Sequence, residues 1–251
     1  MENNKTNRYL KYAIGEIILV VIGILIALQI NNWNEDRKAT IIEENFFDSV
    51  LIDIEKDEEK LIYYEHFHTK RIEYLDTLLT YVRNPKRPMG LNKFAQYIEP
   101  LFYSVSPTVY NTTFESAKSS GVFSNIKAKD LMKQLSQYYA DFTQIENTFN
   151  SITRFVENQL EPLLYNFPED YMTSETGRLV INEEDVNFFY KKIASIEDQR
   201  NLNTDYNAIL RTPKLENIII GDMGRTFNII GKIETRIVDL RQLRTKIINR
   251  D

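Results

Sequence analysis

Apolar residues recur along most of this chain at steps that alternate between four and three positions. This spacing is typical of α-helices that pack side by side along a continuous seam. The first seam comprises Phe47, Leu51, Ile54, Glu58, Leu61, Glu65, His68, Ile72, Leu75, Leu79 and Val82. The second comprises Leu131, Leu135, Tyr138, Phe142, Ile145, Phe149, Ile152, Val156, Gln159 and Leu163. The third comprises Ile219, Met223, Thr226, Ile230, Ile233, Ile237, Leu240, Arg244 and Ile247.

Three long helices with one shared period predict an all-α fold, an elongated antiparallel bundle with coiled-coil-like seams. The first helix should end at about Val82, because Asn84 and Pro85 follow it and proline disfavours helix at the residue before it. Residues 91–103 and 109–119 then predict two shorter helices, and Gly121 suits a left-handed cap after the second.

Proline and glycine also divide the second half of the chain. Pro162 should kink or end the second long helix, and residues 168–178 are the best candidate for a linker. Asn182, followed by three acidic residues, predicts a helix to about Ser195. Thr212 and Pro213 predict the start of the last helix, which should run to about Asn249. The only candidate strand is residues 177–182.

The N-terminal segment differs from the rest because it is apolar on all sides. Residues 12–33 contain one charge, Glu16, and as a helix they would be about 33 Å long, enough to cross a hydrocarbon core of about 30 Å. Tyr9, Tyr12 and Trp33 lie where interfacial aromatic residues are expected. We therefore expect this helix to anchor the protein in the lipid bilayer.

The flanking charges predict the orientation of this anchor. Lys5, Arg8 and Lys11 precede the span, whereas acids and bases balance after it, so the positive-inside rule places residues 1–11 in the cytoplasm. A cleaved signal peptide is the alternative, but no small-x-small cleavage site follows the apolar run. We expect an uncleaved signal anchor at residues 12–33 of the inner (plasma) membrane, with residues 34–251 forming a periplasmic helical domain.

Four residues of the anchor are candidates for helix packing within the membrane: Gly15, Glu16, Gly23 and Ala27. Gly23 and Ala27 form a small-xxx-small pair that permits close approach of a second helix, although small residues are common in such segments. Glu16 lies about one turn inside Tyr12 and can reach water, or can pair with a basic group on a partner helix.

Two blocks of the sequence resemble an uncharacterised family of single-pass membrane-anchored proteins from Bacteroidota-type bacteria. The first block is residues 12–34, and the second runs from Thr113 to Gly121, followed by Ile126 and Leu131. The resemblance implies a cell-envelope protein of a two-membrane bacterium whose domain lies in the periplasm. It implies no activity and no catalytic residues.

Composition excludes several classes of function. The chain has 251 residues, a net charge of −5 and no cysteine, which removes disulfides, thiolate nucleophiles and cysteine-ligated zinc. No basic block is interleaved with aromatic residues, so we expect no nucleic-acid partner. Residues 35–60 hold an excess of acids and residues 225–251 an excess of bases. We therefore expect the last helix to return beside the membrane-proximal part of the first, with Arg241, Arg244, Lys246 and Arg250 near anionic lipid.

One short motif suggests a metal site. Glu65 and His68 have the Glu-x-x-His spacing that places two ligands on one helix face in di-iron bundles, and Glu58 lies one heptad earlier. A second such motif is missing, because the only other histidine is His66. A polar layer that fixes the register of the helices is the more common role of such residues. We expect no metal and no other cofactor.

The remaining motifs also have structural explanations. Lys118 precedes a Ser-Ser-Gly sequence that is far more often a helix cap than a Ser-Lys nucleophile. Gly221, Gly224 and Gly231 lie within a helical pattern with no preceding strand, so they should permit close packing or a bend rather than bind phosphate. We expect no enzymatic activity.

Two classes of function remain. The first is a structural or adaptor module that binds another envelope protein or forms a homo-oligomer. The second is a sensory or ligand-binding helical bundle, which would signal laterally through a partner transmembrane helix because only about eleven residues precede the span. A pocket with convergent polar groups would favour the second class, and an exposed apolar seam would favour the first.

Overall fold

The structure is a computed structural model that describes residues 3–84, 86, 90–105, 107–164 and 205–250. In this part of the chain every regular element is helical, so the predicted all-α fold is confirmed. The predicted linker at 168–178, helix at 182–195 and strand at 177–182 lie outside the described residues.

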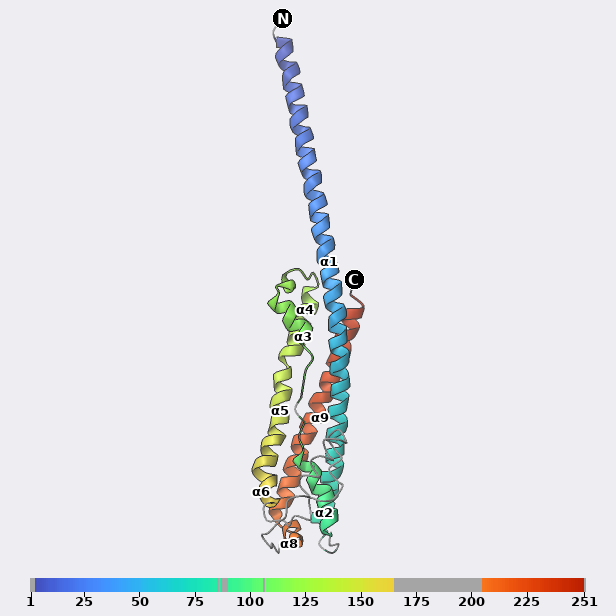
Figure 1. Cartoon of the computed structure of the whole chain (residues 1–251), viewed down its shortest axis with the longest axis vertical. Helices are drawn as coiled ribbons and strands as arrows, with labels where there is room; N and C mark the ends of the chain where they lie inside the picture. The colour runs from blue at the N-terminus through green and yellow to red at the C-terminus, as the bar shows by residue number, and fades with distance from the viewer. Residues whose placement is uncertain (1–2, 85, 87–89, 106, 165–204, 251) are drawn as a thin grey trace, which may run out of the picture.

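Helix α1 (Asn3–Val82) is a single unbroken helix of 80 residues. Its first part projects alone from the bundle, and its second part packs inside it (Figure 1). The helix contains one stretch apolar enough to cross a membrane, with a mean hydropathy of 2.6, and none of that stretch is buried. The helix ends at Val82, as the Asn84–Pro85 sequence predicts.

The connecting elements follow at the far end of the bundle. Helix α2 (Leu91–Ile98) leads into the 3₁₀ turn η1 (Glu99–Phe102), where Pro100 lies in the first turn. An irregular segment, residues 103–105 and 107–111, then runs back along the bundle to α3 (Thr112–Ser119) (Figure 1). This helix begins three residues later than the predicted Val109. Gly121 adopts a φ of 78°, which confirms the predicted left-handed cap.

The second long helix is divided into four pieces. The 3₁₀ turn η2 (Val122–Ser124) precedes α4 (Lys129–Ala140), and α5 (Phe142–Phe155), the π-helical turn η3 (Val156–Leu160) and α6 (Glu161–Leu164) follow. The wide π turn shifts the buried face by one residue, so Leu160 is buried and the predicted seam residue Gln159 is exposed. The helix continues through Pro162, where we predicted a kink or an end.

The chain closes with α8 (Tyr206–Leu210) and α9 (Pro213–Ile248). The Thr212 side chain accepts a hydrogen bond from the Leu215 N–H and Pro213 is the first helical residue, so the predicted start is confirmed. Helix α9 returns antiparallel to α1, and the C terminus lies where α1 leaves the bundle (Figure 1).

The basic end of α9 pairs with acids of α1. Arg250 donates to Asp48 at 3.2 Å, and Arg241 donates to Glu58 at 2.7 Å. Asp48 lies fifteen positions after Trp33, or about 22 Å along an α-helix. The structure supports the predicted return of α9. If Trp33 marks a membrane surface, these bases lie farther from it than the screening length of about 8–10 Å, and their predicted position near anionic lipid stays a prediction.

One continuous hydrophobic core joins α1, α9 and α4–α5. Phe47, Val50, Ile54, Leu135, Ile229, Ile233 and Leu240 are among its fully buried members. Complete burial of one such side chain contributes about 1.5–3 kcal/mol, so the three-helix core provides the main stabilisation of the fold.

Candidate functional site

Buried polar side chains gather where α1 meets α9 and the irregular segment. Asp53, Asp57, His68 and Arg71 of α1 and Asp222, Thr226 and Arg236 of α9 are all less than one-tenth exposed. Charged groups are rarely buried unless they are paired, because transfer from water is costly. This set of residues is therefore the first candidate for a functional site.

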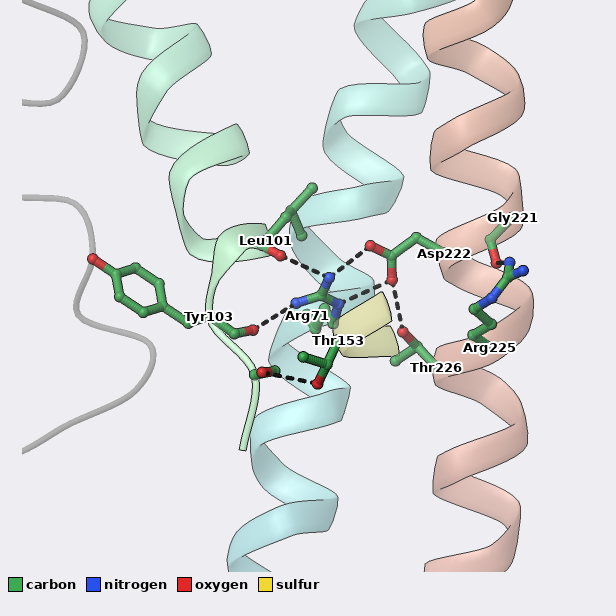
Figure 2. Close-up of polar contacts among 9 residues, drawn as sticks. Arg71, Leu101, Tyr103, Thr153, Gly221, Asp222, Arg225 and Thr226 are labelled. Carbon is green, nitrogen blue, oxygen red and sulfur yellow. Dashed lines mark hydrogen bonds and ion pairs between the residues drawn. The ribbon is translucent and has the colours of Figure 1, made fainter. Parts of the chain in front are cut away.

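The largest cluster is centred on Arg71. Its guanidinium donates to both carboxylate oxygens of Asp222, at 2.9 and 2.6 Å (Figure 2). It also donates to the carbonyl oxygens of Leu101 (2.8 Å) and Tyr103 (3.0 Å). The Thr226 hydroxyl is 3.1 Å from the same Asp222 carboxylate. The cluster thus ties α1, α9 and the end of η1 together at one point.

Both ions of this pair are shielded from water, with side-chain exposures of 0% and 1%. Loss of hydration largely cancels the attraction of a buried pair, so its net contribution to stability is small even though breaking it is costly. A bidentate guanidinium–carboxylate pair is also geometrically specific. The arrangement therefore fixes the register of α1 against α9 rather than adding much net stability.

A second cluster lies toward the anchored end of the bundle. The Asp57 carboxylate accepts hydrogen bonds from the Tyr110 N–H (2.7 Å) and the Tyr138 hydroxyl (3.0 Å). Arg236 lies with its Nη2 at 3.9 Å from the carboxylate and donates to the Tyr138 carbonyl at 2.8 Å. Burial outweighs these favourable contacts and raises the pKa of Asp57 to about 6. Burial likewise raises the pKa of Tyr138.

The charged side chains of α1 bind backbone groups at successive positions in and beside the irregular segment. Arg71 binds the carbonyls at 101 and 103, Asp57 accepts from the N–H of Tyr110, and Asp53 accepts from the N–H of Thr113 at 3.1 Å. This segment is half-buried and has no regular structure, so its backbone has groups that no neighbouring strand or helix satisfies. The buried charges of α1 supply the missing partners, which gives them a structural role.

A groove opens beside the second cluster, between α4–α5 and α9. It has a volume of about 490 Å³, and its lining includes Gln134, Gln144, Lys232, Arg236 and Gln242. Arg236 forms its floor, with the guanidinium 3.7 Å from the centre of the Tyr138 ring. The groove brings amide, ammonium and guanidinium groups together, which are donors suited to a polar ligand.

The candidate metal ligands do not form a site. Glu58 faces Arg241 and Arg244, at 2.7 and 3.7 Å, and Glu65 is half-buried. His68 is buried between aromatic rings, and neither ring nitrogen has a hydrogen-bond partner in the part of the chain that the structure describes. Burial and the nearby Arg71 lower the pKa of His68 to about 3. Among the described residues, no three His, Asp or Glu side chains are placed to hold a metal ion.

The other short motifs are placed in helices and caps. Ser119 and Ser120 donate to the carbonyls of Ser116 and Ala117, as residues at a helix C-terminus do. A methyl group on Gly221 would lie 3.2 Å from Cζ of Phe155, so close packing requires glycine there. Among the described residues, Gly224 and Gly231 have no such neighbour within 4 Å, so close packing within this part of the chain does not explain either glycine.

The four anchor candidates lie on the exposed first part of α1. Gly15, Glu16, Gly23 and Ala27 are all exposed, and both glycines have open space around them. Whether a second helix packs there therefore stays a prediction.

The sequence analysis missed most of the buried charges because one column of each predicted seam was placed one residue too late in the chain. Two residue columns spaced by seven are buried: Val50, Asp57, Tyr64, Arg71 and Leu78 on α1, and Asp222, Ile229, Arg236 and Leu243 on α9. The predicted columns at 51, 58, 65, 72 and 79 and at 223, 230, 237 and 244 were one position later. Of these, Ile237 is buried, Arg244 is exposed and the others are half-buried. Each of the two buried columns contains one acidic and one basic residue. This pattern in the sequence would have indicated the buried charges.

Comparison with known proteins finds a match to one protein family but indicates no activity. No curated protein matches the chain, and no solved structure matches it either. The family match begins at Glu16 in the apolar part of α1 and ends with α4, so it includes Asp57, Arg71 and Tyr138 but not α9. Over residues 16–140, this chain matches the family of unknown function DUF6090.

Proposed function

We propose that this protein is a membrane-anchored envelope protein that acts as a structural or adaptor module. In this proposal residues 12–33 cross the inner membrane with the N terminus in the cytoplasm, and the helical bundle stands in the periplasm. The bundle binds another envelope protein or a second copy of the chain. The proposal includes no enzymatic activity.

The observation that carries this proposal is the continuity of α1. One helix forms both the exposed apolar stretch and a wall of the bundle, without a proline or a described break between them. A flexible linker would let the domain move freely, whereas a continuous helix holds it at a fixed height and rotation. Such a rigid mount suits a module that must meet a partner in a defined geometry.

The buried charges support the same conclusion. Arg71, Asp222, Asp57 and Arg236 use their polar atoms mainly to hold helices and the irregular segment together. Groups that perform chemistry must be able to reach a substrate, but all four are less than one-tenth exposed, and Arg236, which lines the groove, is 5% exposed. Their arrangement favours a rigid scaffold.

Co-purification tests this function directly. The full chain, tagged at its C terminus, is cross-linked in intact cells and purified in mild detergent. We expect a defined envelope partner or a second copy of the chain to be recovered in amounts comparable to the bait. Recovery of the chain as a monomer without a stoichiometric partner would contradict the proposal.

The groove beside Arg236 supports a second candidate function, a ligand-binding bundle that signals through a partner helix. Lys232, Gln144 and Gln242 line this groove with polar groups. For this function, the purified chain should show a ligand-dependent rise in melting temperature that Gln144→Ala and Gln242→Ala abolish. A panel of polar cell-envelope metabolites that leaves the melting temperature unchanged would remove this candidate.

A further inference from the structure

The outward side of α1 carries a stripe of exposed residues that no described part of the chain covers. Ile41 and Ile52 are 45% and 55% exposed, although both are large and apolar. Asn45 lies between them and is also exposed. We call Ile41, Asn45 and Ile52 the outward stripe. Tyr63, 43% exposed, continues it eleven residues further, which is about three helical turns.

The outward stripe continues the small-residue face of the anchor. Gly23 and Ile41 are eighteen positions apart, as are Ala27 and Asn45, and eighteen residues make about five turns of an α-helix. Because α1 is unbroken, each pair lies on the same side of the helix. A helix that packs closely on Gly23 and Ala27 would therefore run along the outward stripe as well.

Most of the charged residues that border the stripe are acidic on one side and basic on the other, although Arg37, eighteen positions before Glu55, is a base on the acidic side. At about 100° per residue, Glu44 and Glu55 fall on one side of it and Lys56 and Lys60 on the other, whereas Glu59, eighteen positions after Ile41, lies in line with the stripe. All five are exposed. Asp48 lies on the acidic side, but its carboxylate accepts from Arg250.

This asymmetry identifies the partner. When two identical helices pack in parallel about a twofold axis, opposite sides of the two contact faces meet. The acidic side of each α1 would therefore face the lysine side of the other. In an antiparallel pair, equal edges meet and like charges would repel. Copies anchored in one membrane have the same orientation, so the charge pattern fits a second copy of this chain.

A groove beside the stripe leaves room for that second helix. It lies between α1 and α3 and has a volume of about 480 Å³; its lining includes the small polar side chains of Ser49, Thr113 and Ser116 and the large apolar side chains of Ile42 and Phe46. It lies on the lysine side of the stripe, so the acidic edge of a second α1 would enter it. Small residues at a helix interface allow the backbones to approach closely.

We propose that this protein forms a parallel dimer through the outward side of α1, from Gly23 and Ala27 in the anchor to Ile52 in the bundle. This inference rests on the proposed anchoring, because the membrane imposes the common orientation. It names the second copy as the partner in that proposal.

Single-cysteine cross-linking in native membranes tests the dimer, and the natural chain has no cysteine to interfere. In a parallel twofold dimer, Ile52→Cys lies opposite its own copy and should form a disulfide-linked dimer under mild oxidation. Val238→Cys is the matched control, because Val238 is 51% exposed but lies on α9. We expect the cross-linked fraction of Ile52→Cys to exceed that of the control several-fold. Equal fractions, or no cross-linked dimer of Ile52→Cys, would overturn the proposal.

Charge reversal in the Ile52→Cys background gives an independent test. The double variant Lys56→Glu with Lys60→Glu should lower the dimerisation constant by about tenfold, and the cross-linked fraction should fall with it. In this variant, attractive Glu–Lys pairs between the two α1 helices are replaced by repulsive Glu–Glu pairs. Adding Glu44→Lys and Glu55→Lys reverses both edges and should restore the fraction. If the cross-linked fraction of the quadruple variant stays as low as that of the double variant, charge pairing across the dimer is refuted.

The two proposals fail in different ways. Absence of the Ile52→Cys dimer, together with recovery of a different envelope protein in the co-purification, would refute self-association and leave the adaptor function intact. A cross-linked dimer in a chain shown to lie outside the membrane would refute the anchoring instead.

Discussion

The buried pair of Arg71 and Asp222 gives the sharpest prediction about the fold. Replacing Asp222 by leucine removes two of the four hydrogen bonds that the Arg71 guanidinium donates, as well as its counter-ion. Because Arg71 is 0% exposed, water cannot replace the lost partner. The free energy of unfolding should fall by about 3–5 kcal/mol, the usual cost of an uncompensated buried charge.

The double variant Arg71→Met with Asp222→Leu separates charge from packing. It removes both ions, so the stranded charge disappears, although the carbonyls of Leu101 and Tyr103 lose a donor. We expect the double variant to be more stable than Asp222→Leu alone. Glu216→Ala is the control, because its ion pair with Arg83 is exposed and should contribute about 0–1 kcal/mol.

Thermal unfolding of the full chain in mild detergent, followed by far-UV circular dichroism, measures these differences. For a bundle of this size each kcal/mol lowers the melting temperature by about 2–4 °C, so Asp222→Leu should melt roughly 6–20 °C below the wild type. A decrease no larger than that of Glu216→Ala would refute the reasoning. So would a double variant less stable than Asp222→Leu.

Further predictions concern other single positions. His68→Phe removes a buried imidazole whose pKa is lowered to about 3. Between pH 6.5, the unfolded pKa, and pH 3, only the unfolded chain binds a proton at this position. The free energy of unfolding of the wild type should therefore fall by about 2 kcal/mol relative to this variant on going to pH 5, as measured by thermal melts at several pH values. Gly221→Ala should destabilise the fold by about 1 kcal/mol through overpacking, whereas Gly224→Ala, with open space around it, should stabilise it by up to about 1 kcal/mol; equal effects would contradict the packing account. Leu160→Ala should cost about 2–5 kcal/mol and Gln159→Ala about zero in the same melts, and the reverse order would refute the register shift at the π turn.

Local signals predicted most of the fold. The C-terminal end of α1 and the start of α9 follow from Asn84–Pro85 and Thr212–Pro213, and the positive φ of Gly121 follows from its position after a helix. Periodicity predicted that three long helices share a core. These features depend on residues close together in sequence, which is why the sequence alone reveals them.

The buried charges depend on distant partners and could not be found in the same way. Arg71 and Asp222 are far apart in sequence, and the partners of Asp57 are the distant Tyr138 and the backbone of Tyr110, in a segment that we predicted to be helical. The π turn that buries Leu160 has no reliable local signature. Pairwise packing of the helices determines these features, and that information is not local.

The anchored topology is the central claim, and cysteine labelling tests it most directly. Asn4→Cys and Asn249→Cys, each made in the cysteine-free full chain, are treated in spheroplasts with a membrane-impermeant maleimide. The account predicts that the reagent labels Asn249→Cys and reaches Asn4→Cys only after the membrane is disrupted. Labelling of Asn4→Cys in intact spheroplasts, with Asn249→Cys protected until disruption, would contradict it.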